Sequence, residues 1–507
     1  MKKRKTLIPV LSVVIILLAV WGGFKLIEAS RDNREAKKGS GQESFSNTVQ
    51  LLWYQIGDPQ TDMDKVLEKV NEYTSAKIGV SLRVIQIGWG DYNRKMQLII
   101  NTGDEYDMAF TSSWANNYLL NAQKGVFLAL NDYLPKYGKE MYEKIDPKFW
   151  EAAKVGGVIY GVPNEKEIGN MPMWVFTKKY VDKYNIPYKE IHSLEDLEPW
   201  LELIKEKEPG IVPLYLTSDY SAPIYMDLIQ EPVGIEYGDT SLTVKNVFET
   251  AKMRETLKVM RKYYQKGYIN QNAAVETDDK SVERFVTKGD GQPYAELIWT
   301  KDLGYDVVAS TIMDVQITNA SARGALTAIS ENSKHPEEAV KFLNLVNTDE
   351  YLRNLLNYGI EGVHYEKVPL TKEDKEKAKG KPYVFDTKIR LIPENQKKYS
   401  VPYWVQGGLF NTYVTESEPI DKWSEFKSFN DSLETAPSFG FDFYAEPVIT
   451  QISGFRSILD EFGAALYTGS VDTDEYLNKL NAKLKTAGIQ DVINEMQAQV
   501  NLWRHNK

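Results

Sequence analysis

The sequence predicts an α/β protein with two α/β regions and a helical C-terminal part. Three observations lead to this fold class. Strand and helix patterns alternate from residue 48 onward, the alternation starts again near residue 165, and only helical periodicity continues from residue 473. Such alternation is typical of a mainly parallel sheet with helices on its faces. The length of 507 residues suits about two to four domains.

The first α/β region is predicted from short apolar runs separated by amphipathic stretches. Its strands are Val49–Tyr54, Val80–Ile87 and Asp107–Phe110, and its helices run from Asp62 to near Gly79 and over Tyr92–Asn101. We expect Asp62 to cap the first helix. In parallel sheets, ligands bind beyond the carboxyl ends of the strands. The residues near these ends are therefore site candidates: Trp53, Trp89, Ser112 and Trp114.

The second α/β region is predicted from the same signals. Its strands are Met173–Thr177, Ile211–Leu216, Glu296–Thr300, Asp306–Thr311 and Gly324–Ile329, and its helices include Lys178–Asn185 and Glu249–Gln265. Asp219 and Tyr220 follow one of these strands, and Trp299 lies in another, which makes all three further site candidates.

The remaining helices carry explicit boundary signals. Pro336 lies in the first turn of one predicted helix, and Gly359 ends another. Thr473 is expected to cap a helix that stops at Gly488. The charged segment 371–381 is expected to be a solvated surface excursion.

The amino terminus predicts export. A basic tetrapeptide precedes Leu7–Phe24, 18 residues without a charge, which span about 27 Å as a helix. Positive charges on the leading side keep that side in the cytoplasm and place the rest of the chain outside. We expect residues 1–27 to be an uncleaved membrane anchor or a cleaved signal peptide, followed by a flexible stalk over 28–47.

Composition excludes several classes of function. The chain has no cysteine, so disulfides, thiolate metal sites, cysteine nucleophiles and a lipid-modified cysteine are all excluded. The first 40 residues hold nine Lys or Arg and three Asp or Glu, which leaves 52 basic and 68 acidic residues, a net charge of −16, for the rest. An acidic body argues against nucleic acid as a partner.

No motif for catalysis or for a cofactor occurs. Phosphate-binding loops, dinucleotide fingerprints and nucleophile elbows are all missing. The pairs Asp62/Asp64 and Asp472/Asp474 lack the glycine and glutamate that a calcium loop needs. We therefore predict no metal, no cofactor and no catalytic residue. Aromatic residues make up 12% of the chain, and aromatic faces stack on sugar rings. The strand-end aromatics predict a carbohydrate site, with packing at the sheet edge as the alternative.

Several segments together resemble a known family. In chain order they are Asp107–Phe110 with Ser112-Ser113-Trp114, Gly125–Leu134, Gly157–Pro163 and Trp174–Lys178. They are similar to extracellular solute-binding proteins of ABC importers, which have the type II periplasmic-binding-protein fold, and the resemblance covers residues 48–507. The segments Gly359–Gly362, Gly440–Phe443, Gly469–Asp472, Leu484–Gly488, Glu495–Gln497 and Val500–Trp503 resemble the end of Gram-positive lipoproteins called LipO or LplA.

Two departures from that pattern are visible. The lipobox cysteine of those lipoproteins is absent, so an anchor segment or release into the medium must replace lipidation. The usual Trp-x-x-Gly-Asn is here Trp404-Val-Gln-Gly-Gly408.

The resemblance implies two lobes joined by a hinge, with the ligand between them. It implies lobe 1 over 48–163 with part of 305–360, lobe 2 over 164–304, and a C-terminal region over 361–507 that completes both. Hinge crossings are expected at Val162–Met171, at Tyr305–Asn319 and after Glu361. Tyr444 is expected at the start of the helix that closes the cleft. The full set of expected ligand-binding residues is Trp53, Trp89, Ser112, Trp114, Asp219, Tyr220, Trp299, Glu361 and Tyr444.

The expected function is therefore capture of a carbohydrate, most simply an oligosaccharide, by a monomer on the outer face of the membrane. Its partners would be the permease subunits of an ABC transporter. Two alternatives stay open from sequence: an exported polysaccharide-processing enzyme, and a sensory ligand-binding protein.

Overall fold

The computed structural model describes residues 48–169, 171–278 and 280–506. The predicted anchor Leu7–Phe24 and the predicted stalk 28–47 lie outside these residues. No helix within the described residues is both long enough and apolar enough to cross a membrane. All elements below belong to one unit, residues 49–507.

The first sheet has the strand order β2-β1-β3-β14-β6. Its strands are β1 (Val49–Ile56), β2 (Val80–Ile87), β3 (Met108–Thr111), β6 (Val162–Pro163) and β14 (Leu326–Ile329). Strand β1 pairs in parallel with both β2 and β3, as the alternating pattern predicts, whereas β14 is antiparallel to β3 and β6. We call this sheet and the helices around it the first lobe.

The helices of the first lobe enclose a core around Trp53 and Phe342. They are α2 (Met63–Ile78), α3 (Tyr92–Thr102), α4 (Tyr118–Gln123), α5 (Leu134–Tyr137), α6 (Lys139–Lys144), α7 (Pro147–Ala153), α12 (Asn319–Ala322), α13 (Pro336–Thr348) and α14 (Glu350–Tyr358). Helix α2 ends where predicted, because Gly79 adopts a left-handed conformation (φ 68°) and closes its last turn. The short hairpin β4 (Lys154–Val155) and β5 (Val158–Ile159) follows α7.

The second sheet has the order β13-β7-β12-β8 and organises the second lobe. Strand β7 is antiparallel to both its neighbours, while β12 and β8 run in parallel. The strands are β7 (Met171–Thr177), β8 (Val212–Leu214), β12 (Arg284–Gly291) and β13 (Val307–Thr311). A smaller antiparallel sheet holds β9 (Met226–Gln230), β10 (Val233–Glu236) and β11 (Val244–Asn246).

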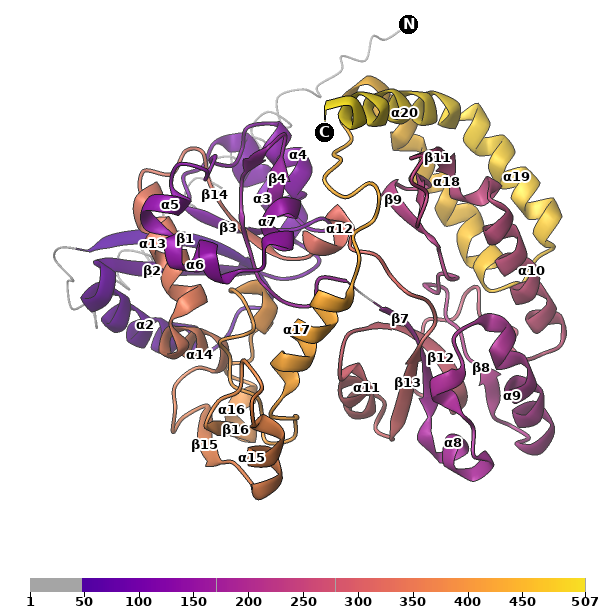
Figure 1. The fold of residues 1–507 in the computed structure, drawn as a ribbon, viewed down its shortest axis with the longest axis horizontal. Coiled ribbons are helices and arrows are strands. Elements are labelled where there is room, and N and C mark those ends of the chain that lie inside the picture. Colours follow the sequence, from indigo (N-terminus) through magenta and orange to yellow (C-terminus); the bar gives the residue numbers. More distant parts are fainter. Residues whose placement is uncertain (1–47, 170, 279, 507) are drawn as a thin grey trace, which may run out of the picture. The chain divides into compact units, whose positions relative to one another are not determined.

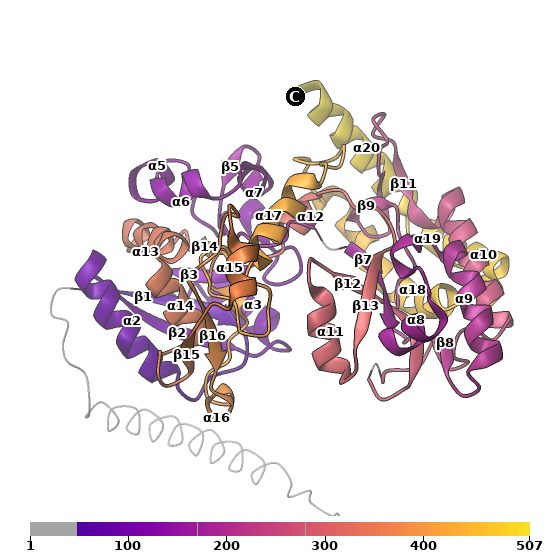
Figure 2. The same ribbon diagram turned by 60° about the horizontal axis from the view of Figure 1, so that its bottom comes forward.

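The last helices of the chain pack onto the second lobe. Helices α18 and α19 lie beside α10 in both views (Figure 1, Figure 2). The helices of this lobe are α8 (Lys178–Tyr184), α9 (Leu194–Lys207), α10 (Ala251–Gln265), α11 (Ala295–Leu303), α18 (Ile449–Tyr467), α19 (Thr473–Thr486) and α20 (Ile489–Asn506), with short 3-10 turns η1 (Tyr188–Glu190), η2 (Val247–Glu249) and η4 (Glu446–Val448). Their buried residues join those of the second sheet in one core.

The chain passes between the two cores three times. The first passage lies between Ile168, in the core of the first lobe, and Trp174, in the core of the second lobe. The second passage returns from Ile312, in the core of the second lobe, to Ile317, in the core of the first. The third passage precedes Phe441, which belongs to the second core. The passages are tied to one another: the Ile317 amide donates to the Glu434 carbonyl at 2.8 Å, and Asn430 bonds both Ile168 and Lys166.

The segment between α14 and the third passage forms two small cores of its own. We count it with the first lobe, because Arg353 of α14 and Asn164 both donate hydrogen bonds to its backbone. It contains β15 (Tyr365–Pro369), α15 (Lys372–Ala378), β16 (Thr387–Leu391), α16 (Pro393–Gln396), η3 (Tyr403–Val405) and α17 (Lys422–Ser432). Most of the segment 371–381 is exposed, as predicted, but it forms helix α15 and is anchored at one buried residue, Asp374. Thr371 and Asp374 form a capping box at the start of α15, and Asp374 pairs with the largely buried Lys388 at 2.7 Å.

Three local predictions are also wrong. The stretch 296–300 is part of helix α11 rather than a strand. The Asp62 side chain does not cap α2; it pairs instead with Lys65 and His364. The cap of α19 is Asp472, whose carboxylate accepts from the Glu475 amide, and Thr473 is the first helical residue.

Candidate ligand-binding site

Three tryptophans form an aromatic cluster at one edge of the first lobe. The rings of Trp89 and Trp114 stack with centroids 6.3 Å apart and an interplanar angle of 19°. Trp404 lies 5.9 Å from Trp89 and 5.8 Å from Trp114, and buried Phe110 supports Trp114 and Trp404 from below. Trp89 is 45% and Trp114 49% exposed. A contiguous group of exposed aromatic rings is typical of a binding surface.

A buried turn holds Trp114 in place. The Ser112 hydroxyl accepts from the Ala115 amide at 2.8 Å and from the Trp114 amide at 3.3 Å. The Trp114 indole donates to the Gly324 carbonyl at 3.0 Å, which fixes the ring from another part of the chain. Ser112 itself is fully buried. The Ser112 hydroxyl thus shapes the turn, and its contact with a ligand stays a prediction.

A buried polar network holds Trp404. The Asn164 side-chain amide donates to the carbonyls of Trp404 and Val405, both at 2.9 Å. The guanidinium of Arg353, which is fully buried, donates to the carbonyls of Tyr403 and Gly408 at 2.5 and 2.8 Å. Burial lowers the pKa of Arg353 to about 10. A guanidinium in such a position replaces water for the carbonyls of the loop and keeps Trp404 in one orientation.

A cavity of about 520 Å³ opens beside this cluster. Trp114 and Trp404 line it from the first lobe, and Gln292 and Ile298 line it from the second. Lys166 and Glu167, which form an ion pair with each other, also face the cavity from the first passage between the lobes. The cavity thus combines aromatic faces with an ammonium, a carboxylate and a carboxamide. These groups complement a sugar, whose apolar ring faces stack on aromatic rings and whose hydroxyls bond to charged and amide groups.

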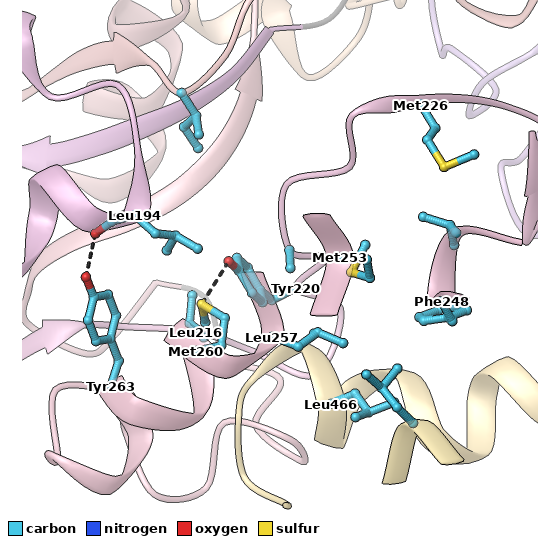
Figure 3. Packing of buried hydrophobic residues seen from close by; sticks show 14 of the residues in the cluster. Leu194, Leu216, Tyr220, Met226, Phe248, Met253, Leu257, Met260, Tyr263 and Leu466 are labelled. Atoms are coloured by element: carbon cyan, nitrogen blue, oxygen red, sulfur yellow. Dashed lines mark hydrogen bonds between the residues drawn. The ribbon is translucent and has the colours of Figure 1, made fainter. Parts of the chain in front are cut away.

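The three predicted residues of the second lobe gather in a different cavity. Asp219, Tyr220 and Trp299 line a space of about 390 Å³ together with Arg284 and Lys288. Tyr220 is only 8% exposed and contributes to the core, where its hydroxyl lies 3.6 Å from the Met260 sulfur (Figure 3). Burial raises its pKa well above the ordinary range.

Trp299 packs onto the second sheet. A Cβ atom added to Gly289 or to Gly291 would come within 2.7 Å of its ring. Glycine at these two positions of β12 therefore makes room for the indole. The Trp299 ring is half-buried: part of it packs on β12, and part of it lines the cavity.

Three further site candidates line neither of these two cavities. Trp53 is fully buried and contacts Phe342 edge to face, because β1 continues to Ile56 and turns Trp53 into the core. Glu361 is exposed and pairs with Lys367 on β15 at 3.4 Å. Tyr444 precedes η4 and α18 rather than starting the helix, and its backbone is bonded to Gln499 of α20.

Sequence reasoning missed several residues at the aromatic cluster. Trp404 was noticed only as part of a motif, and Lys166, Glu167 and Gln292 gave no signal because charged and amide side chains are common everywhere. Tyr294 was missed as well. It has a left-handed backbone (φ 65°) at the start of α11, and its hydroxyl donates to Asp421 across the lobes at 3.3 Å. Burial raises its pKa to about 12. A non-glycine residue in this conformation is uncommon and is often functional.

One buried carboxyl lies close behind the site. Glu165 directly precedes the Lys166–Glu167 pair and accepts from the Asp146 amide at 3.2 Å. Burial raises its pKa to about 7, although the hydrogen bond from the Asp146 amide and the charges of Lys427 and Lys144 lower it. Within the described residues, no three His, Asp or Glu side chains are arranged to hold a metal ion.

Comparisons with known proteins agree with this architecture. The family described as bacterial extracellular solute-binding protein matches residues 57–352, and a domain of unknown function matches residues 437–505. A carbohydrate ABC transporter substrate-binding protein of Streptococcus pneumoniae serotype 4 is 31% identical over 469 residues, 90% of this chain and 91% of that protein. A polygalacturonan/rhamnogalacturonan-binding protein of Bacillus subtilis is 20% identical and covers 70% of this chain and 74% of its own.

Solved structures show the same fold. The N-glycan transport solute-binding protein NgtS of Streptococcus pneumoniae has a TM-score of 0.80 and 30% identity, and covers 90% of this chain and 99% of that one. Its complex with Man5GlcNAc has a TM-score of 0.68, 31% identity and the same coverage. The first family match spans more than half of the chain. The two-lobed fold, the resemblance noted from sequence and this match agree, and the chain belongs to the bacterial extracellular solute-binding proteins.

Proposed function

We propose that the protein captures an oligosaccharide outside the cell in the cavity beside the Trp89–Trp114–Trp404 cluster and delivers it to the permease of an ABC importer. The exposed, rigidly held tryptophan pair carries this proposal. The names of the relatives support the class of ligand, since they include a carbohydrate transporter's substrate-binding protein and an N-glycan transport protein.

The cavity suggests how each group acts. The faces of Trp89 and Trp114 stack on sugar rings, and the loop that holds Trp404 closes one side. Lys166, Glu167 and Gln292 exchange hydrogen bonds with hydroxyls. Residues of both lobes line the cavity, so a ligand gains contacts from both when they approach. Binding then shifts the population toward the closed form. No bond of the ligand is made or broken in this function.

The proposal extends to the whole chain. The lobes move about a hinge formed by the three passages, with domain limits near those expected from sequence. The protein acts as a monomer at the outer face of the membrane, where the segment 1–27 anchors it, since a chain without cysteine carries no thioether-linked lipid.

Titration calorimetry of the purified protein tests the proposal. We expect binding of Man1GlcNAc or Man5GlcNAc and a loss of at least about tenfold in affinity for Trp114→Ala. Tyr351→Ala is the matched control, because Tyr351 is a similarly exposed aromatic residue that packs against Tyr73 of α2. If the parent binds neither glycan, or Trp114→Ala binds as tightly as Tyr351→Ala, the proposal is wrong.

A further inference from the structure

A second cavity adjoins the aromatic cluster. It measures about 700 Å³, more than the 520 Å³ of the first cavity. Ile298 and Tyr403 line both, so the two spaces meet at these residues. Each volume falls within the range of about 300–1,000 Å³ that is usual for a complete small-ligand site. Together they offer more room than a disaccharide fills.

The wall of the second cavity comes from the segment between the two family matches. One match ends at residue 352 and the other begins at residue 437. Every first-lobe residue of the cavity lies between them, from Asn357 to Trp423. The opposite wall is α11 of the second lobe, which presents Leu297 and Ile298, 40% and 43% exposed. Exposed leucine and isoleucine side by side on a helix indicate a binding face.

The first-lobe wall is rigid before any ligand arrives. The Trp423 indole donates to the Thr412 carbonyl at 2.7 Å, and the Tyr358 hydroxyl to the Tyr413 carbonyl at 2.7 Å. The Lys422 ammonium lies 4.5 Å from the centre of the Trp423 ring and pairs with Glu418 at 2.7 Å. A preformed wall lowers the entropy lost on binding.

The charges of this wall are already paired. Glu418 is neutralised by Lys422 and Glu416 by Arg390, at 2.7 and 3.0 Å. The second-lobe wall adds the neighbouring pair Lys301 and Asp302, which carry opposite charges. No sign of charge is left in excess among these groups, whereas the hydroxyls of Ser417 and Thr415 border the same space. The wall therefore suits a neutral ligand that is rich in hydroxyl groups.

We propose that the second cavity is an outer compartment of the ligand site, which takes the distal units of a neutral oligosaccharide whose first units occupy the tryptophan cavity. This inference rests on the proposed function. It assigns to residues 353–436 a role in the choice of ligand length. Short sugars use only the tryptophan cavity, and longer ones gain affinity from both.

A blocking variant tests the outer compartment. Ser417→Trp places a large side chain at an exposed position of its wall, and Leu297→Ala removes an apolar contact from the opposite wall. Titration calorimetry with Man1GlcNAc and Man5GlcNAc measures both ligand lengths on each protein. The parent should bind Man5GlcNAc at least about tenfold more tightly than Man1GlcNAc. In Ser417→Trp this advantage should fall to about threefold or less, with Man1GlcNAc affinity unchanged. Leu297→Ala should also reduce the affinity advantage of Man5GlcNAc over Man1GlcNAc.

Ser453→Trp is the matched control, because Ser453 is an exposed serine on α18, outside both cavities. It should bind both glycans as the parent does. Equal affinity of the parent for both glycans, or an undiminished advantage of Man5GlcNAc in both variants, overturns the outer compartment while the proposed function stands. Equal weakening of both glycans by Ser417→Trp also overturns it. If the parent binds neither glycan, the proposed function and this inference fall together.

Discussion

The aromatic residues predicted for the two lobes have opposite environments. In the first lobe, Trp89 and Trp114 stack on each other at the surface, and Trp114 borders a cavity. In the second lobe, Tyr220 is in the core and Trp299 is packed over two glycines of β12. All four were predicted from the same pattern, an aromatic residue in or just beyond an expected strand.

The difference lies in what covers each ring. Met260 of α10 closes over Tyr220, and β12 receives Trp299. The Trp114 ring is fixed by a hydrogen bond at its edge to Gly324, which leaves a face open. An aromatic residue at a predicted strand end therefore indicates the edge of a sheet. Whether that residue is buried in the core or exposed at a site depends on the distant segments that fold over the edge.

The largest effect is expected from a comparison of a fully buried tryptophan of the first lobe, Trp53, with a nearly half-exposed one, Trp89. Trp53→Ala should lower the free energy of unfolding by about 3–5 kcal/mol, because it leaves a cavity beside Phe342. Trp89→Ala removes a ring that is nearly half exposed and should cost less than about 1 kcal/mol. Urea unfolding followed by circular dichroism measures both. Similar losses in the two variants would contradict the distinction between core and surface.

A second effect concerns the buried carboxyl behind the site. Burial raises the pKa of Glu165 from 4.5 to about 7. Its contribution to stability is therefore fully present below pH 4.5 and is lost as the pH rises through 7. Glu165→Gln removes that loss, so at pH 8 it should be more stable than the parent by up to about 3 kcal/mol, and nearly equal at pH 4.5.

Unfolding curves at several pH values measure this difference between parent and variant. Some pH dependence should persist in Glu165→Gln, because burial also raises the pKa of Asp227 in the second lobe, to about 6. A difference between the two proteins that does not change with pH would show that folding does not raise the pKa of Glu165.

A third pair separates binding from packing. Trp114→Ala should weaken oligosaccharide binding at least about tenfold and leave the melting temperature of the free protein nearly unchanged. Trp299→Ala should do the reverse: it exposes Gly289 and Gly291 and should cost about 1–3 kcal/mol of stability, with affinity nearly intact. Calorimetric titration and thermal unfolding of both variants decide between the roles. If Trp299→Ala loses affinity without losing stability, Trp299 is a ligand-binding residue rather than a packing residue.

Much of the fold could be predicted because local patterns determine it. The order of β1, α2, β2, α3 and β3 follows from apolar periodicity, and Gly79 marks the end of α2. Helix α11 was predicted as a strand because Leu-Ile-Trp-Thr suits both structures when the segment is short. Strand β12 was missed because its sequence, Arg284–Gly291, contains few β-branched residues and two glycines that serve Trp299.

The site was predictable only in part. Trp89 and Trp114 could be placed at neighbouring strand ends, and the structure brings them together; their contact with a ligand stays a prediction. Trp404 reaches the same place from the far end of the sequence, held by Asn164 and Arg353. Such long-range placement leaves no local signal. The family assignment was confirmed because it rests on many weak motifs in a fixed order.

The smallest effect is expected at the point where the two lobes touch beside the site. Tyr294 donates its hydroxyl proton to Asp421 at 3.3 Å, and Asp421 is also paired with Lys381 at 2.6 Å. Tyr294→Phe keeps the ring and removes one bond between the lobes. Since Lys381 still satisfies Asp421, the loss should be about 0.5–1.5 kcal/mol of contact between the lobes, which corresponds to roughly a two- to tenfold faster release of ligand. The melting temperature without ligand should stay nearly constant.

Stopped-flow measurement of ligand release gives the rate. Tyr264→Phe is the control, because the Tyr264 hydroxyl bonds the Gln271 carbonyl within the second lobe. An unchanged release rate would show that the contact adds nothing to closure. A release rate that changes equally in Tyr264→Phe would show that the effect belongs to the second lobe as a whole. An effect confined to Tyr294→Phe would show that, among the second-lobe aromatic residues compared, Tyr294 acts on ligand release through its bond to Asp421.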